Sequence, residues 1–283
     1  MVQAILSYLW AATLASLTQI GIFLVPGLVL TLMMNYASTF VQRRALLKMG
    51  KGWYLGLFGW LGTIIHELGH AVFCLIFRHK ITTLKLFDPD PKTGTLGYVK
   101  HTYDSSSIYQ LVGNFFIGIG PILIGTSIIY LLLFFLLGLN PFKSVNNFNI
   151  MSPHIYSWDV LKQIFQIFWT SSTNLLSEVF SWQNLSTWQL YVFIYLAFTI
   201  GSSITLSPSD IKSSLKGLSV ILILIFIFNL ATVWAGDLTS NIFIGTVSYF
   251  LVFYIAMFLI LLLDIVVSIL LLLPLSILRT RHS

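Results

Sequence analysis

The chain has 283 residues, of which 57% are hydrophobic and only 8% are charged, and its mean hydropathy is +0.90. Because a soluble domain carries roughly 25% charged residues, this composition excludes an ordinary soluble protein and indicates a chain that lies in a lipid bilayer. The net charge of +6 does not predict a nucleic-acid partner, since Lys and Arg lie in short segments beside apolar runs, where they set membrane orientation. We therefore expect an integral multi-pass protein, and its abundant Phe and Ile suit a prokaryotic cell membrane.

Apolar runs predict the number of membrane-spanning helices, because each crossing of the hydrocarbon core needs about 20 apolar residues. Six runs are long enough, and Gly21, Pro26 and Gly27 predict a bend in the first of them. We expect an all-α membrane protein that forms a single polytopic domain over residues 1–283. The predicted spans cover residues 4–34, 53–77, 108–138, 188–206, 217–235 and 243–277.

Lys and Arg residues between the predicted spans indicate the orientation, since cytoplasmic loops carry their excess. Six crossings with both termini inside place the basic segments 78–107 and 207–216 in the cytoplasm. The segment 35–52 conflicts with this topology, because its basic residues would then lie outside. The path of the first predicted span therefore stays open.

The second predicted span contains the segment HELGH, in which His66 and His70 flank Glu67. Positions i and i+4 lie about 40° apart around a helix, so both imidazoles can bind one cation. Glu67 can then reach a metal-bound water and act as its general base, which is typical of HExxH zinc proteases. An ionised carboxylate at the centre of a membrane helix costs about 2.5 to 3.5 kcal/mol, and a metal site would offset that cost. The alternative is that the three polar side chains pair with one another or with a neighbouring helix.

Two polar segments between the predicted spans are expected to have structure of their own. In residues 81–102, β-branched and aromatic residues flank the turn sequence DPDPKTG, which predicts a short membrane-associated β-hairpin directly after the HELGH helix. Residues 139–187 are rich in Asn, Ser and Trp, and they predict a loop with one or two helices at the membrane interface.

A catalytic zinc site needs a third protein ligand beside the two histidines, with a fourth position open for water. Glu178 is a candidate, because other HExxH enzymes use a glutamate further along the chain. Asp264 lies deep in the last apolar run and is a functional candidate as an intramembrane acid, although it could instead hydrogen-bond a neighbouring helix. Asp237 is expected in a loop, and His101 is expected to have a surface or interfacial role.

The segment GTIIHELGHAVF at residues 62–73 resembles the HExxH helix of the site-2 protease family. The predicted hairpin after it, and GPILIG at residues 120–125, resemble the hairpin and the glycine–proline segment of the next core helix in that family. The resemblance implies a Zn²⁺-dependent enzyme that cleaves transmembrane protein substrates. It also implies a metalloprotease core at about residues 53–216, with flanking helices at 4–34 and 217–277.

The resemblance further implies the third zinc ligand, because the family takes it from an aspartate at the cytoplasmic end of the third core helix. Asp210, in the sequence SPSD, stands at the matching place, so the implied ligands are His66, His70 and Asp210, with Glu67 as the catalytic base. SPSD lacks the Asp-Gly pair frequent in the family, and Gly125 stands where the family often has Asn. Asp210 could instead cap the helix that begins near it.

Two other functions stay open on the sequence alone. A membrane-anchored, gluzincin-like protease would use Glu178 as its third ligand. A non-proteolytic membrane transporter or scaffold would use the HELGH segment as a polar relay or a metal-transit site. Neither the substrate nor the oligomeric state can be predicted from these residues.

Overall fold

The computed structural model describes residues 1–90, 92, 95–146 and 158–279. The elements along the chain are α1 (Val2–Phe23), α2 (Val25–Met49), α3 (Lys51–Tyr54), the π-helix η1 (Leu55–Gly59), α4 (Trp60–Ile76), β1 (Lys80–Lys85), β2 (Tyr98–Thr102), α5 (Ile108–Gly118), α6 (Gly120–Leu137), α7 (Pro141–Asn146), α8 (Trp158–Val179), α9 (Trp182–Leu185), α10 (Trp188–Gly201), α11 (Pro208–Thr232), the 3₁₀ helix η2 (Val233–Ala235) and α12 (Gly236–Arg279).

Within the described residues, five helical segments are long and apolar enough to cross a membrane. Together with one two-stranded sheet, they confirm the prediction of an all-α membrane protein with a small β-hairpin. The predicted span 108–138 is divided into α5 and α6 at Ile119, and α10 is a shorter apolar helix. The five segments cover Val2–Met49, Lys51–Ile76, Gly120–Leu137, Pro208–Thr232 and Gly245–Leu270.

Two segments predicted as loops are helical instead. α2 continues to Met49, and Gly50 ends it with a φ of 78°. Asp237, which was expected in a loop, lies in α12. Neither segment contains a Pro to stop the helix, so the polar residues that suggested loops are accommodated as helical turns.

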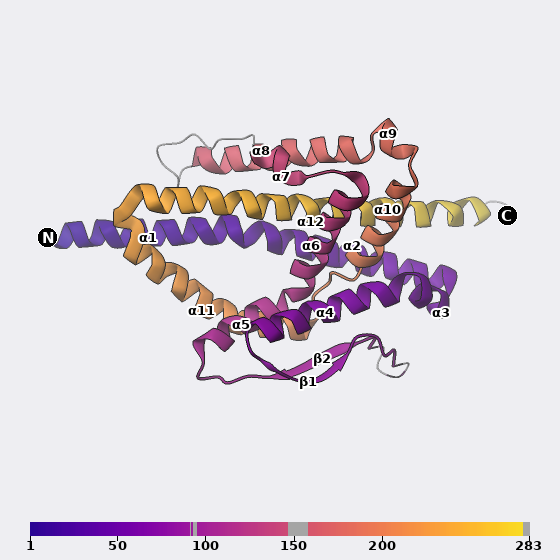
Figure 1. The fold of residues 1–283 in the computed structure, drawn as a ribbon, viewed down its shortest axis with the longest axis horizontal. Helices are drawn as coiled ribbons and strands as arrows, with labels where there is room; N and C mark the ends of the chain where they lie inside the picture. The colour runs from indigo at the N-terminus through magenta and orange to yellow at the C-terminus, as the bar shows by residue number, and fades with distance from the viewer. Residues whose placement is uncertain (91, 93–94, 147–157, 280–283) are drawn as a thin grey trace.

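The bend expected in the first span is found as a break at Leu24, which separates α1 from α2. Pro26 lies in the first turn of α2, where its missing N–H is tolerated. Figure 1 shows the long α1–α2 pair running beside α12, and α8 packs along α12. α8 has 22 residues, so the segment 139–187 holds a long helix as well as the short α7 and α9.

The HELGH segment lies in α4, which contacts α6 and α10 at backbone distance. A Cβ atom at Gly69 would lie 2.6 Å from the backbone nitrogen of Pro121, and one at Gly62 would lie 2.4 Å from the carbonyl oxygen of Thr199. Such close approach requires glycine and is typical of helix pairs in membranes. The start of α6 and the end of α10 are therefore brought against the two turns of α4 that carry the histidines.

The hairpin predicted at residues 81–102 is confirmed, with Ile81 opposite His101 and Lys85 opposite Tyr98 in an antiparallel pair. It lies along α4 (Figure 1). A Cβ atom at Gly97 would come within 2.9 Å of Cγ of Glu67. The hairpin backbone is therefore packed directly against the glutamate of the HELGH segment.

Candidate metal centre

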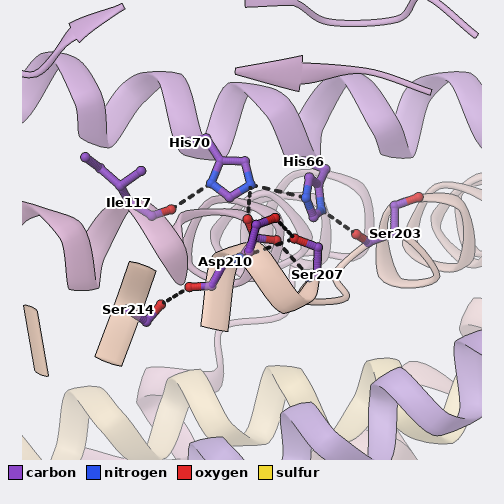
Figure 2. Close-up of polar contacts among 8 residues, drawn as sticks. His66, His70, Ile117, Ser203, Ser207, Asp210 and Ser214 are labelled. Atoms are coloured by element: carbon purple, nitrogen blue, oxygen red, sulfur yellow. Dashed lines mark hydrogen bonds and ion pairs between the residues drawn. The ribbon is translucent and has the colours of Figure 1, made fainter. Parts of the chain in front are cut away.

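His66 and His70 of α4 and Asp210 of α11 meet at one point, although 140 residues separate His70 from Asp210 along the chain. Figure 2 shows the two imidazoles facing the carboxylate. The Nε2 atoms of His66 and His70 lie 3.3 Å apart, and Oδ1 of Asp210 lies 3.5 Å from Nε2 of His70. One ligand atom from each residue falls within 4.8 Å of the others. In the part of the chain that the structure describes, this is the group of His, Cys, Asp and Glu side chains that could hold a metal ion.

Both imidazoles are oriented by backbone carbonyl groups. Nδ1 of His66 donates to the carbonyl oxygen of Ser203 over 2.8 Å, and Nδ1 of His70 donates to that of Ile117 over 2.7 Å. A carbonyl oxygen can only accept, so in the neutral rings the proton lies on Nδ1 and the lone pair on Nε2. The two Nε2 lone pairs therefore converge beside the Asp210 carboxylate, as expected of metal-binding histidines with a fixed tautomer.

The Ile117 carbonyl receives the cap N–H of Ile119 but lacks the usual donor at residue 121, because that residue is Pro121. In a continuous helix residue 121 would donate its N–H to this carbonyl, and proline has no N–H to donate. The same proline lies in the first turn of α6 after the break at Ile119. The glycine–proline pair thus both breaks the helix and leaves an acceptor for His70.

The Ser203 carbonyl lies just beyond the end of α10, where helix geometry leaves carbonyl groups without intrahelical partners. The N–H of Ser207, four residues later, donates instead to Oδ2 of Asp210 over 2.8 Å. The Ser203 carbonyl is thereby available to His66, and the chain between α10 and α11 contributes to both sides of the site.

Asp210 caps α11, and its position is also compatible with the ligand role that the sequence left as the alternative. Oδ2 accepts the Ser207 N–H while Ser207 Oγ accepts the N–H of Asp210, which forms a capping box at the start of α11. Oδ1 points to His70 (Figure 2). Its side chain is 14% exposed, so the carboxylate is largely withdrawn from solvent. A helix cap and a candidate metal ligand coexist because they use different oxygen atoms.

Glu67 is buried on α4 between the two histidines and interacts electrostatically with Asp210. The other acidic candidates lie elsewhere. Glu178 is exposed near the end of α8, and Asp264 is fully buried in α12, where Oδ2 accepts a hydrogen bond from Ser38 over 2.9 Å. Neither belongs to the group around His66 and His70.

A second histidine pair lies at the base of the hairpin, where sequence reasoning expected only a surface or interfacial role for His101. Nδ1 of His79 lies 3.0 Å from Nδ1 of the half-buried His101, and Nε2 of His79 donates to the Gln110 carbonyl over 2.9 Å. Burial lowers the pKa of His79. Burial, and then the neighbouring His79 and His70, lower the pKa of His101 to about 4. Both rings are therefore neutral at pH 7.

The chain matches no protein-family model, no curated protein and no solved structure. The fold and the site define a helical membrane protein in which two histidines and an aspartate, from two candidate membrane-spanning segments, converge at one point.

Proposed function

We propose that this protein is an integral membrane zinc metalloprotease that hydrolyses peptide bonds in or near the transmembrane segments of membrane-protein substrates. The observation that carries the proposal is the convergence of His66, His70 and Asp210 within 4.8 Å. Two imidazole nitrogens and one carboxylate oxygen leave a fourth tetrahedral position open, which is the ligand arrangement of a catalytic zinc site.

The tautomers of the two histidines favour a bound cation over a purely polar network. Each ring donates its proton from Nδ1 to a carbonyl group, so neither neutral ring has a proton to share at Nε2. Two lone pairs 3.3 Å apart, beside a carboxylate, repel one another unless a positive charge lies between them. A divalent metal ion satisfies all three groups at once.

The HELGH order supports hydrolysis as the reaction. When bound, zinc polarises a carbonyl group and lowers the pKa of a water molecule. Glu67 would take a proton from the attacking water and return it to the leaving amine as the peptide C–N bond breaks. One water molecule is consumed, and the products are a carboxylate and an amine.

The position of the site supports a membrane-embedded substrate. His66, Glu67 and His70 belong to the apolar segment Lys51–Ile76, and Asp210 begins the apolar segment Pro208–Thr232. A soluble peptide would have to enter a largely lipid-facing molecule, whereas a transmembrane substrate already lies at that depth. Its helix must unwind before cleavage, because a helix encloses its carbonyl groups in hydrogen bonds.

The test uses the full chain reconstituted in liposomes with a fluorescently labelled single-span protein that carries a Gly-Pro pair in its span. We expect cleavage by the wild type and none by Glu67→Gln, with zinc retained in the variant because Glu67 is not a ligand. Cleavage by Glu67→Gln at the wild-type rate would contradict the proposal and point to a scaffold or transporter. Loss of zinc in Glu178→Gln, with retention in Asp210→Asn, would point to the gluzincin-like alternative.

A further inference from the structure

The turn after α10 receives two side-chain hydrogen bonds on consecutive carbonyl groups. The Ser203 carbonyl accepts from His66. The Ser202 carbonyl accepts from Nε2 of Gln42 over 2.9 Å, and Gln42 belongs to α2, 160 residues earlier in the chain. A helix outside the predicted core 53–216 therefore bonds to the peptide group next to the one that orients His66.

The turn is also held by contacts on its other sides, so the Gln42 hydrogen bond helps to fix where the turn lies. Ser202 is fully buried, and its side chain hydrogen-bonds with that of Tyr54 in α3. Gly201 lies against Ile260 of α12, because a Cβ atom there would fall 2.4 Å from Cγ2 of that residue. The backbone at 201–203 is thus held from α2, α3 and α12 together.

The Gln42 amide supplies this turn with a hydrogen-bond donor that the helix itself lacks. Carbonyl groups at the end of a helix have no intrahelical donor, and at membrane depth there is little water to replace one. Without Gln42 the Ser202 carbonyl would turn to find another donor. Because Ser202 and Ser203 share a planar peptide group, that rotation changes the direction of the chain at Ser203 and so the direction of its own carbonyl.

We propose that Gln42 is a positioning residue for the candidate metal centre, whose amide holds the Ser202–Ser203 turn so that the Ser203 carbonyl meets Nδ1 of His66. This inference rests on the proposed function, since it assumes that His66 binds zinc. Loss of a direct hydrogen-bond partner of a metal ligand lowers metal affinity roughly 10- to 100-fold. Gln42 bonds to the Ser202 carbonyl and not to the Ser203 carbonyl that His66 uses. We therefore expect zinc affinity to fall by the lower end of this range, about tenfold.

The experiment compares three variants of the full chain in detergent micelles. Gln42→Met has nearly the same shape but no donor, and Gln42→Lys keeps donors on a longer side chain. Gln19→Met is the matched control, because Gln19 lies in the neighbouring α1 and donates to Asn229 over 3.2 Å, in a cluster of its own. Zinc affinity is measured by competition with a chromophoric chelator, and the geometry of the site by the visible spectrum of the Co²⁺-loaded protein.

We expect Gln42→Met to bind zinc about tenfold more weakly and to shift the Co²⁺ spectrum. Gln42→Lys should bind within about threefold of the wild type, and Gln19→Met should match it. Thermal unfolding of each variant shows whether the fold is kept. The inference is overturned if Gln42→Met retains wild-type affinity and spectrum, if Gln42→Lys fails to restore them, or if Gln19→Met loses zinc equally. If the wild type binds zinc and cleaves its substrate, any of these results overturns only the role of Gln42. If the wild type binds no zinc, both proposals are overturned.

Discussion

Asp210 divides its two carboxylate oxygens between the capping box and the candidate metal centre, so a substitution can separate the two roles. Asp210→Asn keeps a side-chain oxygen for the Ser207 N–H but loses the charge that faces His70. We expect thermal stability to stay close to that of the wild type. Zinc affinity should fall by more than the roughly 10- to 100-fold that follows loss of a ligand's own partner.

Equilibrium dialysis against buffered zinc, run beside thermal unfolding, measures both quantities. Glu178→Gln is the control, because that exposed acid lies outside the metal group. If Asp210→Asn lowers stability and leaves zinc affinity unchanged, Asp210 is only a helix cap.

Pro121 affects the site without being a candidate ligand, because it has no N–H to compete with His70 for the Ile117 carbonyl. Pro121→Ala supplies an N–H that can donate to this carbonyl and compete with Nδ1 of His70. We expect zinc affinity to fall about tenfold. Pro208→Ala is the control, since Pro208 is the first residue of α11, where a helix leaves N–H groups unbonded. Equal zinc affinity in the Pro121 and Pro208 variants, measured by chelator competition, would mean that the missing N–H does not matter.

At the scale of elements, the site depends on how closely α4 approaches α6. Gly69→Ala would place a Cβ atom 2.6 Å from the backbone of Pro121. This clash is relieved only if the two helices move apart. We expect a loss of about 1 to 3 kcal/mol in the free energy of unfolding, as for other overpacked sites. Gly21→Ala should change it little or raise it by up to about 1 kcal/mol, since nothing lies within 4 Å of that position in α1.

Unfolding in mixed micelles of increasing denaturing-detergent fraction gives both free energies. Similar stabilities for Gly69→Ala and Gly21→Ala would show that α4 and α6 are not in backbone contact.

His79 attaches the base of the hairpin to α5, because it contacts His101 of β2 and donates to the carbonyl of Gln110 in α5. This attachment should weaken in acid. In the attached state the pKa of His79 lies below 6.5 and that of His101 lies at about 4, while a detached histidine titrates near 6.5. The detached state therefore binds more protons between about pH 6.5 and pH 4, so attachment is complete above this window and is lost as the pH falls through it. A proton on His79 would oppose its Nδ1–H to that of His101.

Hydrogen-exchange protection of residues 80–85 and 98–102, corrected for intrinsic rates, should decrease from pH 7.5 to pH 5.5. The decrease should be smaller in His101→Gln, which keeps a donor for His79 but does not titrate. Protection that is independent of pH in the wild type would contradict this role of the histidine pair.

The secondary-structure elements could be predicted from the sequence more completely than the candidate site. Apolar runs predicted a helical membrane protein, and the DPDPKTG turn predicted the hairpin, because both signals are local. The helical extension of α2 to Met49 was missed, since polar composition alone does not end a helix and residues 35–49 contain no Gly or Pro. HELGH indicated two ligands by spacing alone, whereas the carbonyls of Ile117 and Ser203 and the amide of Gln42 act through tertiary contacts that leave no pattern in the sequence.

At the scale of the whole molecule, the helices outside the predicted core take part in the site. α2 and α12 run side by side, and both reach the turn at Ser202, through Gln42 and through Ile260 beside Gly201. Asp264 joins the same two helices through Ser38. The candidate metal centre is therefore in contact with helices on both sides of the expected core at 53–216.

The most direct test of the account is the metal content of the purified full chain, measured by mass spectrometry for the wild type, His66→Ala and Glu67→Gln. We predict one zinc ion per chain in the wild type and in Glu67→Gln, and almost none in His66→Ala, because His66 belongs to the candidate metal group and Glu67 does not. A wild type without zinc, a different metal such as iron in its place, or equal zinc in His66→Ala would contradict the account.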